Sequence, residues 1–317
     1  FIGSLNQTIS GLFTNSNALN NLEINNANGV TVTNDIEIDR ELKLINGIID
    51  VAPGSLFRMN YGASVSPVVG SSSSFVSGTL TKELMTGNSF AYPVGRIGQH
   101  GPIVLQTVTG PAGINDWKVS YYFDNASLVG YDTESFESAI STVSHSEYWK
   151  IEAPTGGASR ISIVLDGSSD VASSAGSLSN IRVVGWNAAN EEWEIVGNGA
   201  TASGTATSGT ITTTASVNYG SYTYFTLASV TPVITGTATI TSAPVVNLCS
   251  GSSTTIRVTF SGPAPYVLSY NAGATSVTTP PIGASFFDIT VNPSTTTVYT
   301  LTGITANGVA GTITGNA

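Results

Sequence analysis

Apolar residues recur in closely spaced pairs along residues 19–51, and this spacing constrains the fold more than any other feature of the chain. One residue separates the two apolar side chains of each pair, which is typical of a β-strand with one buried face. The pairs begin every six to eight residues, and polar residues or glycine separate them. They are Leu22/Ile24, Val30/Val32, Ile36/Ile38 and Leu42/Leu44, with Ile48 starting a fifth group. Strands this short and this regular predict a β-solenoid.

Three short strands would make one coil of this solenoid, because three steps lead from Leu22 to Leu42, a distance of 20 residues. Asparagine and glycine, which tolerate positive φ, are expected at the corners. We assign residues 1–72 to the solenoid, and a set of ordinary hairpins is the alternative. The expected stacks are Leu22/Ile24 on Leu42/Leu44, Val30/Val32 on Ile48, and Ile36/Ile38 on Leu56 and its neighbours.

Longer alternating runs follow and predict a β-sandwich over residues 73–230. Residues 75–84, 117–123 and 160–165 are examples, and turn signals separate many of these runs. Residues 231–317 form a third unit in this interpretation. Short strands alternate there with proline-rich turns, which favours an immunoglobulin-like sandwich. The whole chain is therefore predicted to be all-β.

Composition limits the class of partner. Only 9% of the residues are charged, the net charge is −10, and the 10 basic residues are scattered. This argues against nucleic acid, because phosphate binding needs clustered lysine and arginine. No apolar run approaches the roughly 18 residues of a spanning helix, so we expect no membrane insertion. Low charge, few lysines and abundant threonine favour an extracellular protein.

A series of motifs runs through the first two predicted units: NNLEINNANGVTV, SSFVSGTLTKEL, FAYPVGR, SEYWKIE, VVGWNAANEEWEIVG and SYTYFTLAS. In this order they resemble a module of very large surface proteins that gliding bacteria and their relatives export through the type IX secretion system. The later segments CSGSSTTIRVTFSGPAPYVLSY and TVYTLTGITANGVAGTITG resemble the immunoglobulin-like repeats of the same proteins, which include gliding-motility adhesins. The resemblance covers nearly the whole chain.

This resemblance implies a structural or adhesive segment of a large secreted protein at the cell surface, one that spans distance and displays a binding surface. Its expected partners are other domains of the same long chain, surface polysaccharide, or the secretion and motility machinery. Such repeats often carry a second cysteine near the last strand, where this chain has Val309. Cys249, the only cysteine, is therefore expected to be unpaired and to serve as a small buried hydrophobic residue.

Few groupings in the sequence could support catalysis. His100 and His145 are the only imidazoles, and neither a nucleophile elbow nor a zinc-binding histidine pair accompanies them. Asp35, Glu37 and Asp39 alternate with apolar residues, so they should point outward together as a solvated acidic edge. We predict that the chain is not an enzyme. A polysaccharide-cleaving solenoid enzyme that uses such carboxylates is the least favoured alternative.

Two sets of residues are candidate binding sites. Asp166 and Asp170 lie around a glycine turn, where oxygen ligands would suit calcium, and no other cofactor is expected. Tyr219, Tyr222 and Tyr224 are candidate ligand contacts, since Tyr222 and Tyr224 should share one strand face and offer a flat aromatic surface to a sugar. They support the alternative function, a carbohydrate-binding module. The tryptophans are instead expected in the core: Trp117, Trp149, Trp186 and Trp193.

The segment ITGTA at residues 234–238 returns as ITGNA at residues 313–317, an offset of 79 residues. This interval suits one small sandwich and its link. Residues 1–12 resemble a solenoid coil entered midway. We therefore expect a longer protein with tandem immunoglobulin-like units after residue 317.

Overall fold

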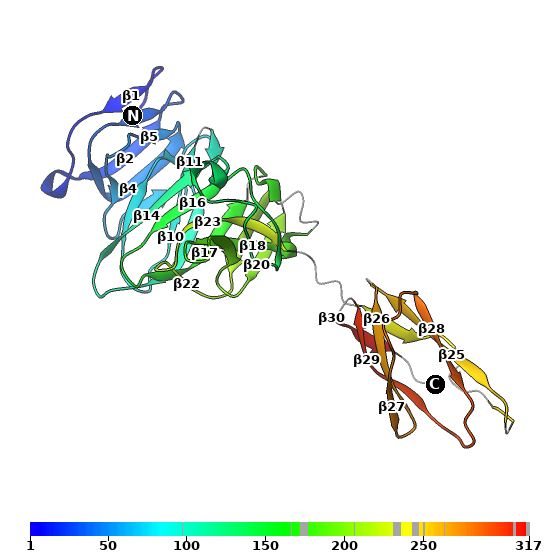
Figure 1. Cartoon of the computed structure of the whole chain (residues 1–317). Helices are drawn as coiled ribbons and strands as arrows, with labels where there is room; N and C mark the ends of the chain where they lie inside the picture. The colour runs from blue at the N-terminus through cyan, green and yellow to red at the C-terminus, as the bar shows by residue number, and fades with distance from the viewer. Residues whose placement is uncertain are drawn as a thin grey trace. The chain divides into compact units, whose positions relative to one another are not determined.

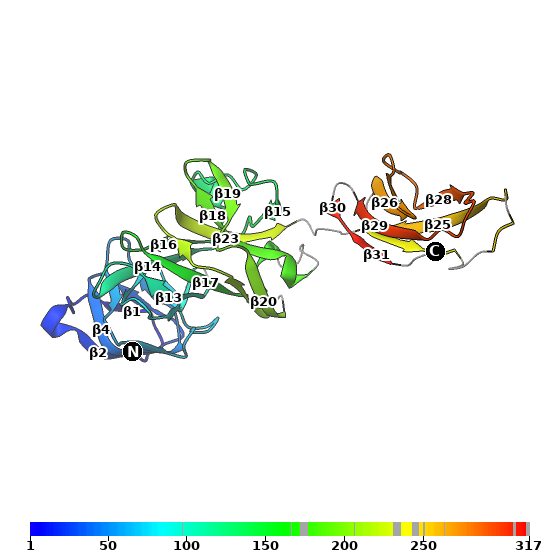
Figure 2. The ribbon, with the colours of Figure 1, turned by 90° about the horizontal axis from the view of Figure 1, so that it is seen from below.

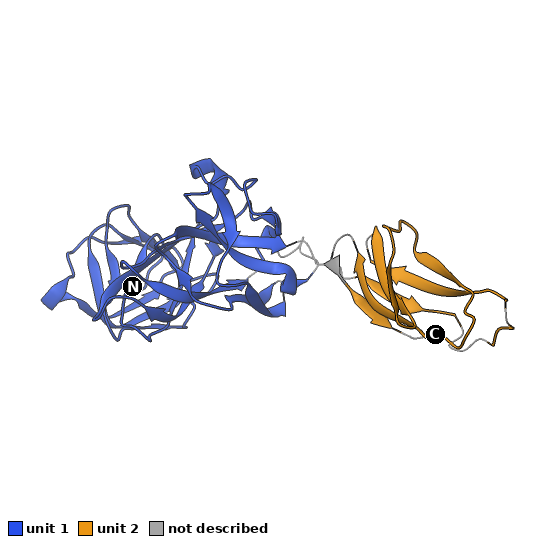
Figure 3. Ribbon diagram, turned by 60° about the horizontal axis from the view of Figure 1, so that its bottom comes forward, with its two compact units in different colours: residues 1–231 blue, residues 232–317 orange. Residues whose placement is uncertain are grey.

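The chain divides into two compact units, Phe1–Thr231 and Pro232–Ala317 (Figure 1, Figure 3). The predicted boundary between residues 230 and 231 lies within one residue of this division. The structure confirms the predicted all-β architecture. Among the described residues, three short 3₁₀ helices accompany the strands: η1 (Asn15–Asn17), η2 (Ala126–Val129) and η3 (Leu178–Asn180). The computed structural model describes residues 1–96, 98–165, 167–171, 177–205, 207–230, 236–242, 247–249, 251–262, 264–306 and 309–314.

Parallel ladders of short strands form the predicted solenoid at the start of unit 1 (Figure 1). Its strands are β1 (Gln7–Ile9), β2 (Leu19–Asn25), β3 (Val30–Val32), β4 (Ile36–Asn46), β5 (Ile49–Val51), β6 (Phe57–Met59), β7 (Ser64–Ser66) and β8 (Val76–Ser77). Leu22 pairs with Leu42 and Ile24 with Leu44, as expected. The long strand β4 turns a corner, because its first part pairs with β6 and its second part with β2 and β7.

Apolar side chains fill the interior of the solenoid. Ile24, Val32 and Ile38 are fully buried and Leu44 is 2% exposed, which confirms the predicted inward ladders. One register prediction was wrong by a residue, because Val30 pairs with Ile49 and not with Ile48.

The corner before Ile49 explains this shift. Gly47 there has φ of 98°, and a Cβ atom on it would lie 1.8 Å from the backbone oxygen of Asn26. The chain therefore passes too close to the coil below for any other residue, and the strand starts one position later.

The solenoid passes into the sandwich without a break in hydrogen bonding. Strand β9 (Leu80–Leu84) pairs in parallel with β6 on one side and antiparallel with β14 (Asn115–Tyr122) on the other. The stack of β1, β3, β5 and β8 likewise continues in parallel to β11 (Val94–Arg96). The division expected at residue 72 is therefore not a break between compact units. The last coil departs from the 20-residue spacing, because longer loops precede Val65 and Val76. Val65 follows its partner Leu42 by 23 residues, and Val76 follows its partner Ile49 by 27 residues.

Two sheets face each other in the sandwich part of unit 1. One contains β14, β16 and β23, which lie side by side in Figure 2, and the other contains β10, β13, β17, β21 and β20. The remaining strands of the unit are β10 (Phe90–Tyr92), β12 (Gln99–His100), β13 (Ile103–Thr109), β15 (Ile140–Val143), β16 (Tyr148–Glu152), β17 (Ala158–Leu165), β18 (Ile181–Asn187), β19 (Glu192–Ile195), β20 (Ala200–Thr205), β21 (Ser208–Thr213), β22 (Val217–Asn218) and β23 (Tyr222–Val230).

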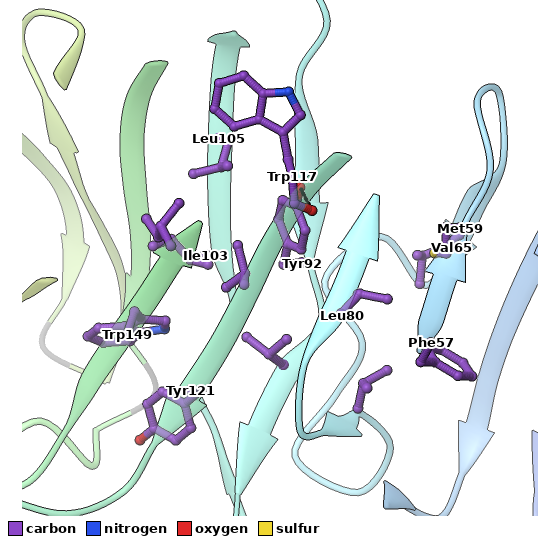
Figure 4. Close-up of a cluster of buried hydrophobic side chains, with 14 of the residues drawn as sticks. Phe57, Met59, Val65, Leu80, Tyr92, Ile103, Leu105, Trp117, Tyr121 and Trp149 are labelled. Atoms are coloured by element: carbon purple, nitrogen blue, oxygen red, sulfur yellow. Dashed lines mark hydrogen bonds between the residues drawn. The ribbon is translucent and has the colours of Figure 1, made fainter. Parts of the chain in front are cut away.

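One apolar core runs from the solenoid into the sandwich, with members from Ile9 to Leu227. Figure 4 shows part of it, where Tyr92 lies beside Trp117 and donates its hydroxyl hydrogen to the Trp117 backbone oxygen at 3.1 Å. All four tryptophans are at most 9% exposed, so the prediction that they serve the core is confirmed. A smaller cluster surrounds Trp186 of β18 and Trp193 of β19, and β15, β16 and β23 also contribute to it.

Unit 2 has a separate core between two sheets, ordered β28-β25-β24-β31 and β27-β26-β29-β30 in the described residues. Consecutive strands β25 and β26 lie in different sheets, as do β28 and β29, which is the connectivity of an immunoglobulin-like sandwich. The strands are β24 (Thr237–Ile240), β25 (Thr254–Ser261), β26 (Tyr266–Ala272), β27 (Thr275–Thr278), β28 (Phe286–Val291), β29 (Tyr299–Ala306), β30 (Val309–Ala310) and β31 (Thr312–Thr314).

Candidate functional site

The carboxylates of the solenoid bind neighbouring coils. Asp35 accepts a hydrogen bond from the Leu56 backbone N–H at 2.8 Å, and Asp39 accepts one from the Asn60 amide at 2.8 Å. Glu37 is only 6% exposed and pairs with Arg58 at 2.9 Å. The expectation of a solvated acidic edge was therefore wrong at Glu37. Alternation placed these side chains on the outer face correctly, but the stacked coils supply donors that cover them.

Asp170 is hydrogen-bonded to the residues just before β16. Its carboxylate accepts hydrogen bonds from the Ser144 hydroxyl at 2.6 Å and from the His145 backbone N–H at 2.8 Å. Asp166, its proposed partner in a calcium site, lies outside the described residues. Within the described ranges, no three His, Cys, Asp or Glu side chains gather as a metal site would require. Calcium binding at these two residues stays a prediction.

Tyr219 lies in the core and not on a ligand-facing surface. Its side chain is 8% exposed, its hydroxyl is 2.7 Å from the Ser159 hydroxyl, and its ring meets Trp117 edge-on at 5.8 Å. Burial raises the pKa of the Tyr219 phenol well above its ordinary value. The hydrogen bond with Ser159 lowers this pKa, but by less than burial raises it. A ligand could reach this phenol only if the core opened.

Tyr222 and Tyr224 lie on opposite faces of β23, so the expected shared face is not formed. Tyr222 packs against the large core, whereas Tyr224 packs against the smaller cluster with Trp186. The reason is a bulge: between Gly185 and Asn187 the register of β18 against β23 shifts by one residue, which reverses the alternation. The Tyr222 hydroxyl donates to Glu194 at 2.6 Å.

Tyr224 belongs to a tyrosine row that the sequence did not reveal, made of Tyr122, Tyr148, Tyr224 and Tyr131. The rings of Tyr122 and Tyr148 stack with centroids 4.7 Å apart and planes 7° apart, and those of Tyr131 and Tyr224 lie 4.1 Å apart. Arg96 covers Tyr122 at 5.5 Å. Burial raises the pKa of Tyr148 to about 12, so its phenol stays neutral. Each ring therefore has one face against its neighbour in the pair, and that face is not available to a sugar.

A pocket of about 390 Å³ opens where the last solenoid coil meets β9 and β10. Val65 and Leu84 line it from the core side, Tyr61 and Phe90 add aromatic rings, and Lys82 reaches it from β9. Lys82 is only 3% exposed. Burial lowers its pKa to about 8, against a weaker opposing effect of Glu83. The sequence contained a signal here, because Lys82 stands in Leu80-x-Lys82-x-Leu84 where alternation calls for an apolar residue.

A second pocket, of about 480 Å³, lies between His100 and the β20–β21 hairpin. His100 stacks on Phe75 with centroids 5.7 Å apart, and its Nε2 lies 2.7 Å from the Val69 backbone oxygen. The ring is thus fixed between the solenoid and the start of the sandwich. Serine and threonine hydroxyls, among them those of Ser72 and Ser208, line the described part of that pocket together with His100.

Cys249 is free, as expected, but it is exposed and not buried. The described part of unit 2 builds its core from other residues, among them Val258, Leu268 and Ile304. Among the described residues, none of the helices is long and apolar enough to cross a membrane.

The comparisons with known proteins leave this geometry as the basis for assigning a function. No family model, curated protein or solved structure matches the chain. The features that a function must explain are therefore the continuous solenoid and sandwich, the separate immunoglobulin-like unit, and the pocket at Lys82.

Proposed function

We propose that this chain is a structural and adhesive segment of a large secreted cell-surface protein. The observation that carries the proposal is the position of β9, which pairs with a solenoid strand on one edge and a sandwich strand on the other. A ladder of this kind transmits load across the junction, because no flexible linker separates the two parts. The segment would hold its loops at a distance from the cell and present them to a surface.

The charged side chains support this interpretation. Carboxylates that could have served catalysis instead pair with neighbouring coils, as Glu37 does with Arg58 and Asp39 with Asn60. The immunoglobulin-like unit follows with a core of its own, as in chains that gain length by adding units. Extracellular location is part of the proposal and rests on the composition of the chain.

Mechanical unfolding of the whole chain between two handles tests the structural part. We expect unit 1 to unfold in one large step that releases about 80 nm of chain, and unit 2 in a step of about 30 nm. Unit 1 unravelling coil by coil, in many small steps, would contradict a junction that carries load.

Adhesion is tested separately with beads coated with the whole chain and passed over immobilised surface polysaccharide. Retention above that of albumin-coated beads is expected. The proposal also predicts no release of reducing ends from a panel of polysaccharides. Turnover that is lost in Glu37→Gln or Asp39→Asn would make the chain an enzyme and overturn it.

A second candidate function, a carbohydrate-binding module, is favoured by the pocket at Lys82. That pocket combines two aromatic rings with several hydrogen-bonding side chains, which is the composition that sugar binding needs.

A further inference from the structure

Lys82 occupies a position in the solenoid that apolar residues hold in the coils below it. Ile38 pairs with Met59, and Met59 pairs with Lys82, so the three lie in one register column. Ile38 and Met59 are fully buried, and Lys82 is 3% exposed. Lysine is rarely buried to this extent, since an ammonium group loses its hydration there.

Within the described part of the chain, the amine of Lys82 uses only part of its hydrogen-bonding capacity. Its Nζ donates to the backbone oxygen of Asn60 and lies 5.5 Å from the ring centroid of Phe90. An ammonium group carries three donors. The adjacent carboxylate of Glu83 is directed to the Tyr61 backbone N–H, at 2.8 Å, and forms no ion pair with Lys82 in the described structure.

The surroundings of this amine form a site with polar and apolar walls. Tyr61, 47% exposed, and Phe90 line the pocket with rings, and Asn88, Ser89 and Glu83 line it with polar groups. The Ser89 hydroxyl accepts from the Thr107 backbone N–H at 2.8 Å, which leaves its own hydrogen to donate. The volume, about 390 Å³, is within the range of small-molecule sites.

We propose that this pocket binds a sugar acid, with Lys82 Nζ holding the carboxylate and the sugar ring lying against Tyr61. A carboxylate ligand suits the buried amine, because it would accept a charge-assisted hydrogen bond from an N–H of Lys82 that the described residues do not use. The ring hydroxyls would find Glu83, Asn88 and Ser89 as partners. The site rests on the carbohydrate-binding function, for which it names a place and a ligand class.

Binding should weaken as the pH rises from 7 to 9. The pKa of Lys82 lies at about 8, so its positive charge is lost across this interval. Glu83 and Tyr61 are the other titratable groups that line the pocket.

A structural role for Lys82 is the alternative, and it makes a different prediction. The Asn60 oxygen also accepts from the Ala63 backbone N–H at 3.0 Å, so the amine could simply fix the turn at residues 60–63. In that case Lys82→Met would lower stability without changing any ligand affinity.

The test uses the whole chain and follows amide resonances during titration with D-glucuronate and D-galacturonate. D-glucose, D-galactose, acetate and inorganic phosphate are the comparison ligands. We expect saturable shifts at the pocket with the two uronates, and an affinity at least about tenfold weaker in Lys82→Met. Lys43→Met, which removes an exposed lysine from the same unit, is the matched control and should bind as the parent chain does.

Each outcome decides a different point. Uronate binding that Lys82→Met leaves unchanged would overturn this site, and equal binding of acetate or phosphate would reduce it to an anion site without sugar recognition. Binding of neutral sugars alone would keep the carbohydrate-binding function and refute the sugar-acid site. If no sugar binds, both fail. Should Lys82→Met not fold, reductive methylation of the parent chain separates the same outcomes, because uronate, and not glucose, is expected to protect the Lys82 amine.

Discussion

Glu37 and Arg58 form an ion pair of 2.9 Å between successive solenoid coils, 21 residues apart in the chain. The other end of the Arg58 guanidinium lies 2.6 Å from Asp116 on β14. One cation thus links two coils of the solenoid to the first antiparallel strand of the sandwich sheet.

Replacing Arg58 by methionine should destabilise unit 1, because the buried carboxylate of Glu37 would lose its charged partner. We expect a loss of about 2 kcal/mol, between the values for exposed and buried pairs. Urea unfolding followed by tryptophan fluorescence measures it. Lys43→Met is the control, since it breaks the exposed pair with Glu23 and should leave the urea midpoint nearly unchanged. Equal midpoints for the two variants would show that Arg58 does not fasten the junction.

Ile38→Asp should unfold the solenoid, since the new carboxylate would stand in a dry ladder without a partner. A cost of about 4 kcal/mol or more is expected. Ile45→Asp is a matched control on the same strand, because Ile45 is 42% exposed. Circular dichroism and thermal melting compare the two. A cooperative melt of Ile38→Asp at the parent temperature would contradict the interior position of this ladder.

The stability of unit 1 should depend on Lys82 between pH 8 and 10. The folded pKa is lowered to about 8 from 10.5, so the unfolded chain binds more protons in this window, and the stability of the fold rises with pH as the cost of burying the charged amine disappears. Relative to Lys82→Met, the parent chain should gain at most roughly 1.4 kcal/mol per pH unit. Urea titrations of both proteins at several pH values measure the difference. A difference that stays constant from pH 7 to 10 would argue against a buried amine.

Tyr222→Phe should cost about 1 kcal/mol at neutral pH, less than the roughly 1.5–3 kcal/mol of a hydrogen bond to a charged group, because solvent screens Glu194. Burial of Glu194 acts to raise the pKa of its carboxyl, but hydrogen bonds from Tyr222, Asn187 and Asn190 outweigh it and lower the pKa below 4.5. The stabilisation is therefore present above pH 4.5 and fades as the pH falls and the carboxylate is protonated. The cost of Tyr222→Phe should therefore decrease as the pH falls below 4.5. Tyr122→Phe should show no such pH dependence, because Tyr122 packs through its ring against Tyr148 and Arg96.

Leu268→Ala should destabilise unit 2 alone. Leu268 is fully buried, and its truncation should cost about 3 kcal/mol. All four tryptophans lie in unit 1, so tryptophan fluorescence reports that unit, while circular dichroism reports both. We expect the variant to lower one transition in circular dichroism and to leave the fluorescence transition in place. A shift of both would mean that the units unfold together.

The solenoid could be predicted from the amino-acid sequence alone, because the stacking of coils depends on a local period. Pairs such as Leu22 with Leu42 could be predicted from spacing, since parallel coils of nearly equal length place equivalent residues on top of one another. The division before unit 2, the all-β class and the core position of the tryptophans also follow from local composition and alternation.

Contacts between distant parts of the chain determine where those local patterns fail. A bulge against β18 separates Tyr222 from Tyr224, and Tyr219 is buried by Trp117, which is distant in sequence. The continuity at β9 and the pocket at Lys82 arise from contacts between residues far apart along the chain, which no short pattern contains. Long-range packing sets which face of a strand is covered, and for this reason the candidate site emerged from the fold and not from the motifs.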